Sequence, residues 1–191
     1  MISVTYLSNT QGYCPVEAPL LREKIESLLG MRPVIVRVST REIHLYTPIP
    51  LGRRMEETLW DRVAPPSTIE EPACPQSGIP RVLCRYKALL RLERYWEAHE
   101  VGEELWRLGF PAGQLMAVAA GVLARAQEGD SRAVETILDS ILPVVAGGQA
   151  GVGIPLDPAR LREEAYKTLA CSSSSVPLLI IDPPLLSYRR K

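Results

Sequence analysis

The strongest constraint on the fold is a change of hydrophobic pattern near Arg81, after which apolar residues recur at helical spacing. From Arg81 to Leu108 they follow the three- and four-residue steps of one helix face, up to a glycine and a proline. Capping residues and prolines predict three further helices, over about 112–127, 131–143 and 158–169. We therefore expect a helical bundle of about four helices over residues 81–171.

The first 63 residues have a different pattern and predict a small α+β domain. Strands are expected over about 2–7, 33–38 and 42–47, where β-formers or alternating apolar residues occur. Helices are expected from Pro15 to about Leu29 and over 53–62. The order is β-α-β-β-α, so the whole chain is expected to be mainly α with a small N-terminal α+β segment.

The remaining segments connect or extend these two parts. Residues 64–80 contain five prolines and are expected to form a linker between two domains. The glycine-rich stretch 147–155 lacks the Gly-Lys-Ser/Thr of a phosphate loop and does not follow a strand, so it is interpreted as a connector. Residues 172–191 are expected to be an extended C-terminal tail. Its apolar stretch Leu178–Ile181 is typical of a segment that pairs with another copy, which makes a homo-oligomer a candidate.

Composition excludes some classes of function. The 22 basic and 22 acidic side chains balance, which argues against dedicated nucleic-acid binding. No apolar stretch reaches the length of a membrane span and the N-terminus does not resemble a signal peptide, so a cytoplasmic protein is expected. Arginine outnumbers lysine 18 to 4 and Asn9 is the only asparagine, a bias compatible with a thermophilic source.

The four cysteines lack the CxxC spacing of a zinc site. In an ordinary cytosol Cys14, Cys74, Cys84 and Cys171 would be free thiols. In a heat-adapted organism the first disulfide to test is Cys74 with Cys84. Cys14 precedes a helix that begins at Pro15, where a helix N-terminus could stabilise a thiolate, but an ordinary thiol is the main interpretation.

One pair of polar residues stands out on the predicted helix 81–108. His99 and Glu103 are four residues apart and fall on the apolar stripe, between Trp96 and Trp106. Burying a carboxylate is costly unless it is paired, and an imidazole is a suitable partner. The helical wheel of residues 81–108 therefore predicts that the side chains of His99 and Glu103 both point into the interior.

Three interpretations of this pair remain open. It can be a buried polar network that fixes how helices meet, or an acid–base or metal-assisted catalytic site that includes Glu100 in an inter-helix cleft. Alternatively, Trp96, Trp106 and Tyr95 line a groove that binds a partner. No metal or cofactor is assigned, because Glu103 replaces the second histidine of HExxH and Trp96 replaces the glutamate of Glu-x-x-His.

The stretch from Tyr95 to Trp106 resembles the signature helix of the domain-of-unknown-function family 309, in which an Ala-His-Glu core is followed by glutamate and tryptophan. The resemblance covers about residues 81–142 and implies a compact helical bundle without an established activity. The matching positions are Glu97, His99, Glu100, Glu103 and Trp106.

Two positions depart from that family pattern. Gly102 stands where a larger apolar residue is usual, and Met116 replaces a common glutamine. If that glutamine bonds the His–Glu pair in the family, the network in this chain must use another partner. The sequence favours a non-catalytic helical interaction or scaffold module with unknown partners, and the alternative is an uncharacterised enzyme that uses His99, Glu100 and Glu103.

Overall fold

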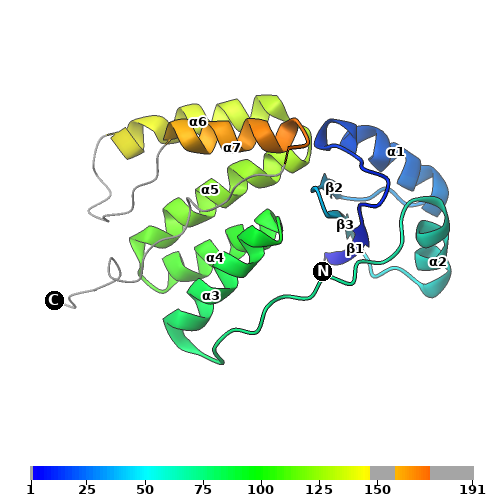
Figure 1. Ribbon diagram of the computed structural model, residues 1–191, viewed down its shortest axis with the longest axis horizontal. Helices are drawn as coiled ribbons and strands as arrows, with labels where there is room; N and C mark the ends of the chain where they lie inside the picture. The colour runs from blue at the N-terminus through cyan, green and yellow to red at the C-terminus, as the bar shows by residue number, and fades with distance from the viewer. Residues whose placement is uncertain (1, 147–157, 173–191) are drawn as a thin grey trace. The chain divides into compact units, whose positions relative to one another are not determined.

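The computed structural model describes residues 2–146 and 158–172, and it is mainly α with a small antiparallel sheet near the N-terminus (Figure 1). The chain folds into two compact units. Among the described residues, unit 1 comprises 2–70, 125–131 and 166–172, and unit 2 comprises 71–124, 132–146 and 158–165. The predicted glycine-rich loop and the tail beyond Ser172 lie outside the described residues.

Unit 1 has the predicted β-α-β-β-α order. Strand β3 (Glu42–Thr47) lies between β1 (Ser3–Ser8) and β2 (Ile35–Val38), and both pairings are antiparallel. Helices α1 (Ala18–Leu29) and α2 (Arg53–Arg62) complete the order, and a short 3-10 helix, η1 (Pro15–Glu17), precedes α1.

The sheet of unit 1 has one apolar face and one polar face, because side chains alternate along each strand. Leu7, Ile43 and Leu45 belong to the apolar core, together with residues of α1 and α2. The register places Tyr6 and Arg37 opposite His44, on the other face. All six residues of β3 are buried, so its polar face is enclosed as well as its apolar face.

Two segments distant in sequence are attached to the N-terminal part of unit 1. The guanidinium Nη2 of Arg37 lies 2.6 Å from Glu128 Oε1, and Arg37 is only 1% exposed. Gly129 packs its backbone on Pro15 and has a φ of +74°. Cys14 and Cys171 form a disulfide across 157 residues of sequence. Residues 125–131 and 166–172 are thereby held against η1 and β2.

Unit 2 contains two helices where the sequence analysis predicted one. Helix α3 (Gly78–Arg91) ends before α4 (Tyr95–Arg107) begins, and Glu93 between them has a φ of 58°. The N–H of Arg94 donates to Leu89 O and that of Glu93 to Leu90 O, the two bonds of a Schellman motif. The single predicted helix is therefore wrong. Glutamate takes the left-handed position that usually holds glycine, so no sequence signal marked the end of α3.

The remaining helices begin and end close to where they were expected. They are α5 (Pro111–Gln127), α6 (Ser131–Ala146) and α7 (Pro158–Leu169). Over the described residues of the bundle region there are thus five helices instead of about four. Arg162 on α7 lies 3.0 Å from Glu135 and 3.3 Å from Asp139 on α6. No helix in the described part of the chain is long and apolar enough to cross a membrane.

We expect Gly129→Ala to destabilise the protein more than Gly12→Ala. Both glycines have a positive φ, which costs an L-residue about 1–2 kcal/mol, but only at Gly129 would a Cβ come within 2.5 Å of the Pro15 carbonyl oxygen. Overpacking should add about 1–3 kcal/mol at Gly129, as measured by urea unfolding. Equal losses for the two variants would contradict the close packing of Gly129 on Pro15.

Candidate functional site

Helix α4 carries all six residues singled out from the sequence, but it does not bury them equally. Its buried positions are Tyr95, Ala98, Val101, Gly102 and Leu105. The helical wheel of residues 81–108 predicted a buried face that includes Trp96, His99, Glu103 and Trp106. In the structure the buried face of α4 is rotated from these positions to the five residues given above. The break before Tyr95 explains the difference, because Leu89 and Leu92 do not belong to the same helix as His99.

The predicted catalytic residues differ in their exposure. The His99 side chain is 20% exposed and the Glu103 side chain 41% exposed. Glu100 is exposed as well. The prediction that Glu103 points into the interior is therefore wrong, although His99 is largely buried. Of the predicted binding residues, Tyr95 is buried, Trp96 is partly buried and Trp106 is 50% exposed.

The imidazole of His99 is engaged on three sides. Its Nδ1 lies 2.8 Å from the carbonyl oxygen of Ala117 on α5. Its Nε2 lies 3.4 Å from Glu103 Oε1. Its ring stacks on Trp96, with centroids 4.8 Å apart and planes at 24°. A carbonyl oxygen can only accept, so Nδ1 carries a proton and donates it to Ala117.

Glycines allow α4 and α5 to approach closely enough for this hydrogen bond. A Cβ on Gly102 would lie 2.5 Å from the backbone nitrogen of Ala117, and a Cβ on Gly113 would lie 2.5 Å from the carbonyl oxygen of Gly102. A Cβ on Gly121 would lie 3.3 Å from His99 Nδ1. Glycine at 102, a departure from the family pattern, is thus required by the backbone contact. The Ala117 carbonyl is the hydrogen-bond partner of His99 on α5.

The arrangement around His99 permits proton transfer between His99 and Glu103. Among the described contacts, no second polar side chain converges on His99. Glu103 can exchange a proton with Nε2, whereas Nδ1 is committed to the backbone of α5. Within residues 2–146 and 158–172, no group of three or more His, Cys, Asp or Glu side chains could hold a metal ion. The geometry directly links α4 to α5.

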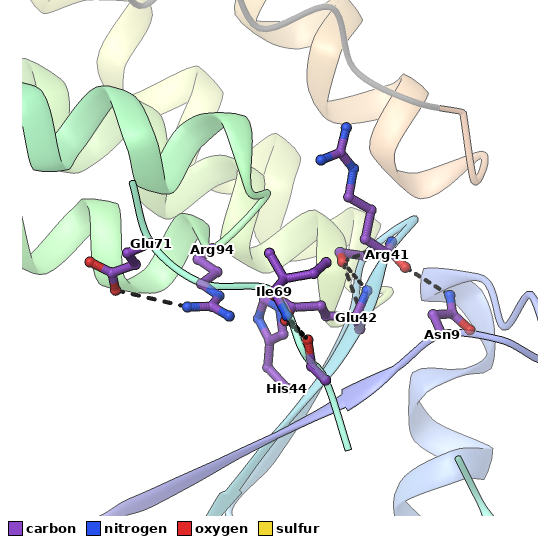
Figure 2. Close-up of polar contacts among 9 residues, drawn as sticks. Asn9, Arg41, Glu42, His44, Ile69, Glu71 and Arg94 are labelled. Atoms are coloured by element: carbon purple, nitrogen blue, oxygen red, sulfur yellow. Dashed lines mark hydrogen bonds and ion pairs between the residues drawn. The ribbon is translucent and has the colours of Figure 1, made fainter. Parts of the chain in front are cut away.

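A second His–Glu pair, which the sequence analysis did not single out, lies on the polar face of the sheet in unit 1 (Figure 2). Glu42 and His44 are two residues apart on β3 and therefore share a face. Both side chains are fully buried, and Glu42 Oε2 lies 3.6 Å from His44 Nε2. Alternation along the strand places the two side chains on one face, but nothing in the sequence marked that face as enclosed.

The polar groups around Glu42 indicate a structural network. Ser67 Oγ donates a short hydrogen bond to Glu42 Oε1 and accepts one from the N–H of Ile69 at 3.1 Å. Tyr6 meets the His44 ring edge to face at 5.2 Å. Neither ring nitrogen of His44 has a hydrogen-bond partner in the described part of the chain. The serine hydroxyl is directed at the carboxylate instead of the imidazole, which is not the arrangement of an activated nucleophile.

All four cysteines are paired in disulfides. Cys74 is bonded to Cys84, the pair that the sequence suggested, with Cα atoms 5.7 Å apart. Cys14 is bonded to Cys171, with Cα atoms 5.1 Å apart. The interpretation of Cys14 as an ordinary thiol is therefore wrong, and as a disulfide sulfur it cannot act as a thiolate. A partner 157 residues away is not visible in local spacing.

The surroundings of Tyr86 change the pKa of its hydroxyl. It is buried at the centre of α3, and its hydroxyl donates to the Met116 carbonyl at 2.9 Å. Burial penalises the phenolate and so raises the pKa of Tyr86 well above its usual range. The hydroxyl remains a neutral donor that links α3 to α5.

Comparison with protein-family models, curated proteins and solved structures finds no match to this chain. The resemblance of α4 to family 309 therefore stays a prediction, and the argument about function depends on the geometry alone.

We expect Ser67→Ala to lower the free energy of unfolding by about 1–3 kcal/mol, because it removes a donor to the buried carboxylate of Glu42. Ser8→Ala is the matched control, since the Ser8 hydroxyl bonds Pro66 O at the surface, and it should cost less than about 0.5 kcal/mol. Chemical denaturation measures both. Similar values for the two variants would show that Glu42 does not depend on Ser67.

Tyr86→Phe should change how stability depends on alkaline pH. A tyrosine whose pKa is raised in the folded state contributes to stability, and this contribution is fully present at pH values below its ordinary pKa of 10.0. This contribution is lost as pH rises above that value, by up to about 1.4 kcal/mol per pH unit. Tyr86→Phe should therefore have a shallower slope than wild type above pH 10.0. A wild-type slope in Tyr86→Phe would refute the assignment.

Proposed function

We propose that the helical part of this protein is a non-catalytic interaction or scaffold module, in which His99 fastens α4 to α5. The observation that carries the proposal is the hydrogen bond from His99 Nδ1 to the Ala117 carbonyl, at 2.8 Å. A histidine whose Nδ1 is bound to a neighbouring helix and whose ring is stacked on Trp96 is suited to a structural role.

The same helix presents a surface suited to a partner. Trp106 near its end is 50% exposed, and Leu108, which follows the helix and is 59% exposed, lines a groove of about 460 Å³ in unit 2. Exposed aromatic and aliphatic side chains at a groove are typical of protein interaction sites. We infer that the binding surface is at the end of α4. Of the three aromatic residues considered as binding residues, Trp106 is best placed, because Tyr95 is buried and Trp96 is stacked on His99.

The alternative is an acid–base enzyme that uses His99, Glu100 and Glu103. One observation favours it: Glu103 is 41% exposed while lying 3.4 Å from His99 Nε2, so this pair can reach solvent. Metal analysis together with a small-molecule melting-shift screen would test it. A bound metal or a stabilising ligand that depends on His99 would favour the enzyme.

Three broader expectations remain proposals. We infer membership of family 309 from the α4 motif, and no dedicated nucleic-acid binding from the balanced charge. A cytoplasmic location is proposed together with a heat-adapted source, because two disulfides would persist in the cytosol mainly of such organisms. Redox analysis of the thiols in native cell extracts would test this combination.

His99→Ala should lower the free energy of unfolding by on the order of 1–3 kcal/mol, because the donor to Ala117 and the packing on Trp96 are lost. His99→Asn should recover part of this loss, since the asparagine amide can lie near the position of Nδ1. His99→Gln places its amide near Nε2 and should recover less. Thermal and urea unfolding of the three variants measure the difference.

Two variants serve as controls for this series. Glu100→Gln and Glu103→Gln change exposed or half-exposed carboxylates, so each should cost no more than about 0.5 kcal/mol. If His99→Ala were as stable as these controls, His99 would not fasten the helices and the proposal would be wrong.

A further inference from the structure

We propose that two copies of this chain pair edge to edge through residues 2–4, at the start of strand β1. The inference is independent of the proposed function, because it concerns the sheet of unit 1 and the proposed function concerns the helices of unit 2. It depends on which backbone groups of β1 the fold itself uses.

Alternate residues of β1 direct their backbone groups toward β3. Just beyond the strand, the N–H of Asn9 donates to the Arg41 carbonyl at 2.7 Å and continues the pairing with β3 (Figure 2). Bonded and non-bonded residues alternate in an antiparallel ladder, so residues 3, 5 and 7 bond to β3. The N–H and carbonyl groups of residues 4, 6 and 8 therefore point outward, along the edge of the sheet.

The segment after α2 covers only the C-terminal half of this edge. The N–H of Ser8 donates to Pro65 O at 2.8 Å, and the N–H of Ser67 donates to Tyr6 O at 3.0 Å. No backbone hydrogen bond joins Val4 to this segment or to any other described segment outside the sheet. The outward N–H and carbonyl of Val4 are therefore available to a further strand.

The composition of this edge favours pairing. Residues 2–8 contain neither a charged residue nor a proline, the features by which edge strands usually resist a further strand. Ile2 is 60% exposed and Val4 is 36% exposed, so apolar side chains accompany the available backbone groups. The opposite edge strand, β2, differs, because its Arg37 is 1% exposed and paired with Glu128. The open edge therefore fits an uncharged, extended segment.

The same residues of a second copy supply such a segment. Two β1 strands can pair antiparallel about a two-fold axis at Ser3, which places Val4 of each copy opposite Ile2 of the other. In this register Val4 exchanges N–H and carbonyl hydrogen bonds with Ile2 of the second copy. Only residues 2–4 pair, so the hydrogen bonds at Tyr6 and Ser8 remain, and no like charges meet.

Sedimentation velocity of the full chain tests the pairing. Over concentrations of about 1–500 µM, we expect a monomer that converts to a dimer with a Kd on the order of 10–100 µM, as is typical of a small interface. Val4→Pro removes an outward N–H that the fold does not use, and each dimer then loses two hydrogen bonds. It should raise the Kd at least about tenfold. Val4→Thr keeps the N–H and the branched side chain, so it should dimerise like the wild type.

Val4→Lys is a second variant, which does not require the strand to accommodate a proline. A lysine on an edge strand opposes pairing, so this variant should also raise the Kd at least about tenfold. Val34→Lys is the matched control, because Val34 is likewise 36% exposed in unit 1, and it should leave the Kd unchanged. Circular dichroism confirms that each variant is folded.

Oxidative crosslinking tests the register. Ser3 lies on the proposed axis, where facing Cα atoms of a non-hydrogen-bonded pair are about 4.5 Å apart, within reach of a disulfide. Ser3→Cys should therefore form a covalent dimer linked through position 3, as mapped by mass spectrometry. Ser8→Cys, at the covered end of β1, should not.

Three results would each overturn the inference. The first is a wild-type protein that stays monomeric over the whole concentration range. The second is a Kd for Val4→Pro, or for Val4→Lys if the proline variant does not fold, equal to that of Val4→Thr. The third is equal crosslinking of Ser3→Cys and Ser8→Cys, or none, because the copies would then meet at another surface.

Discussion

The close approach of α4 and α5 is the constraint on which unit 2 most depends. Two glycines make it sterically possible, since a Cβ at Gly102 would lie 2.5 Å from the backbone of Ala117 and a Cβ at Gly113 would meet the Gly102 carbonyl. At this separation the His99 imidazole spans the interface and donates to the Ala117 carbonyl. A wider separation would leave a largely buried imidazole without its acceptor, which costs more than the hydrogen bond itself contributes.

The two His–Glu pairs lead to the same view of function from different environments. Glu42 and His44 are sealed on the polar face of the sheet, where Ser67 supplies a hydrogen bond to the carboxylate. Glu103 is partly exposed to solvent and His99 is largely buried, with its Nδ1 bound to the backbone of α5. In each pair one member is held by a group outside the pair, Glu42 by the Ser67 hydroxyl and His99 by the Ala117 carbonyl. This pattern supports structural roles and a module that acts through its surface.

Much of the fold could be predicted because local chemistry determines it. Gly109 and Gly129 end helices in left-handed conformations, as the sequence indicated. The end of α3 could not be predicted, because Glu93 occupies the same kind of position without glycine's advantage. Because α3 and α4 were predicted as one helix, the predicted buried face of α4 was rotated, and Glu103 was predicted to lie too far inside. The pairing of Cys14 and the enclosure of the polar sheet face depend on contacts distant in sequence, which hydrophobic periodicity does not report.

Nitrogen-15 NMR of the His99 imidazole tests the central claim most directly. If His99 fastens α4 to α5, Nδ1 carries the proton in the neutral ring, and its resonance has the chemical shift of an N–H nitrogen whose proton exchanges slowly with water. The opposite tautomer, with an unprotonated Nδ1 and a proton on Nε2, would contradict the account, because such a ring cannot donate to the Ala117 carbonyl.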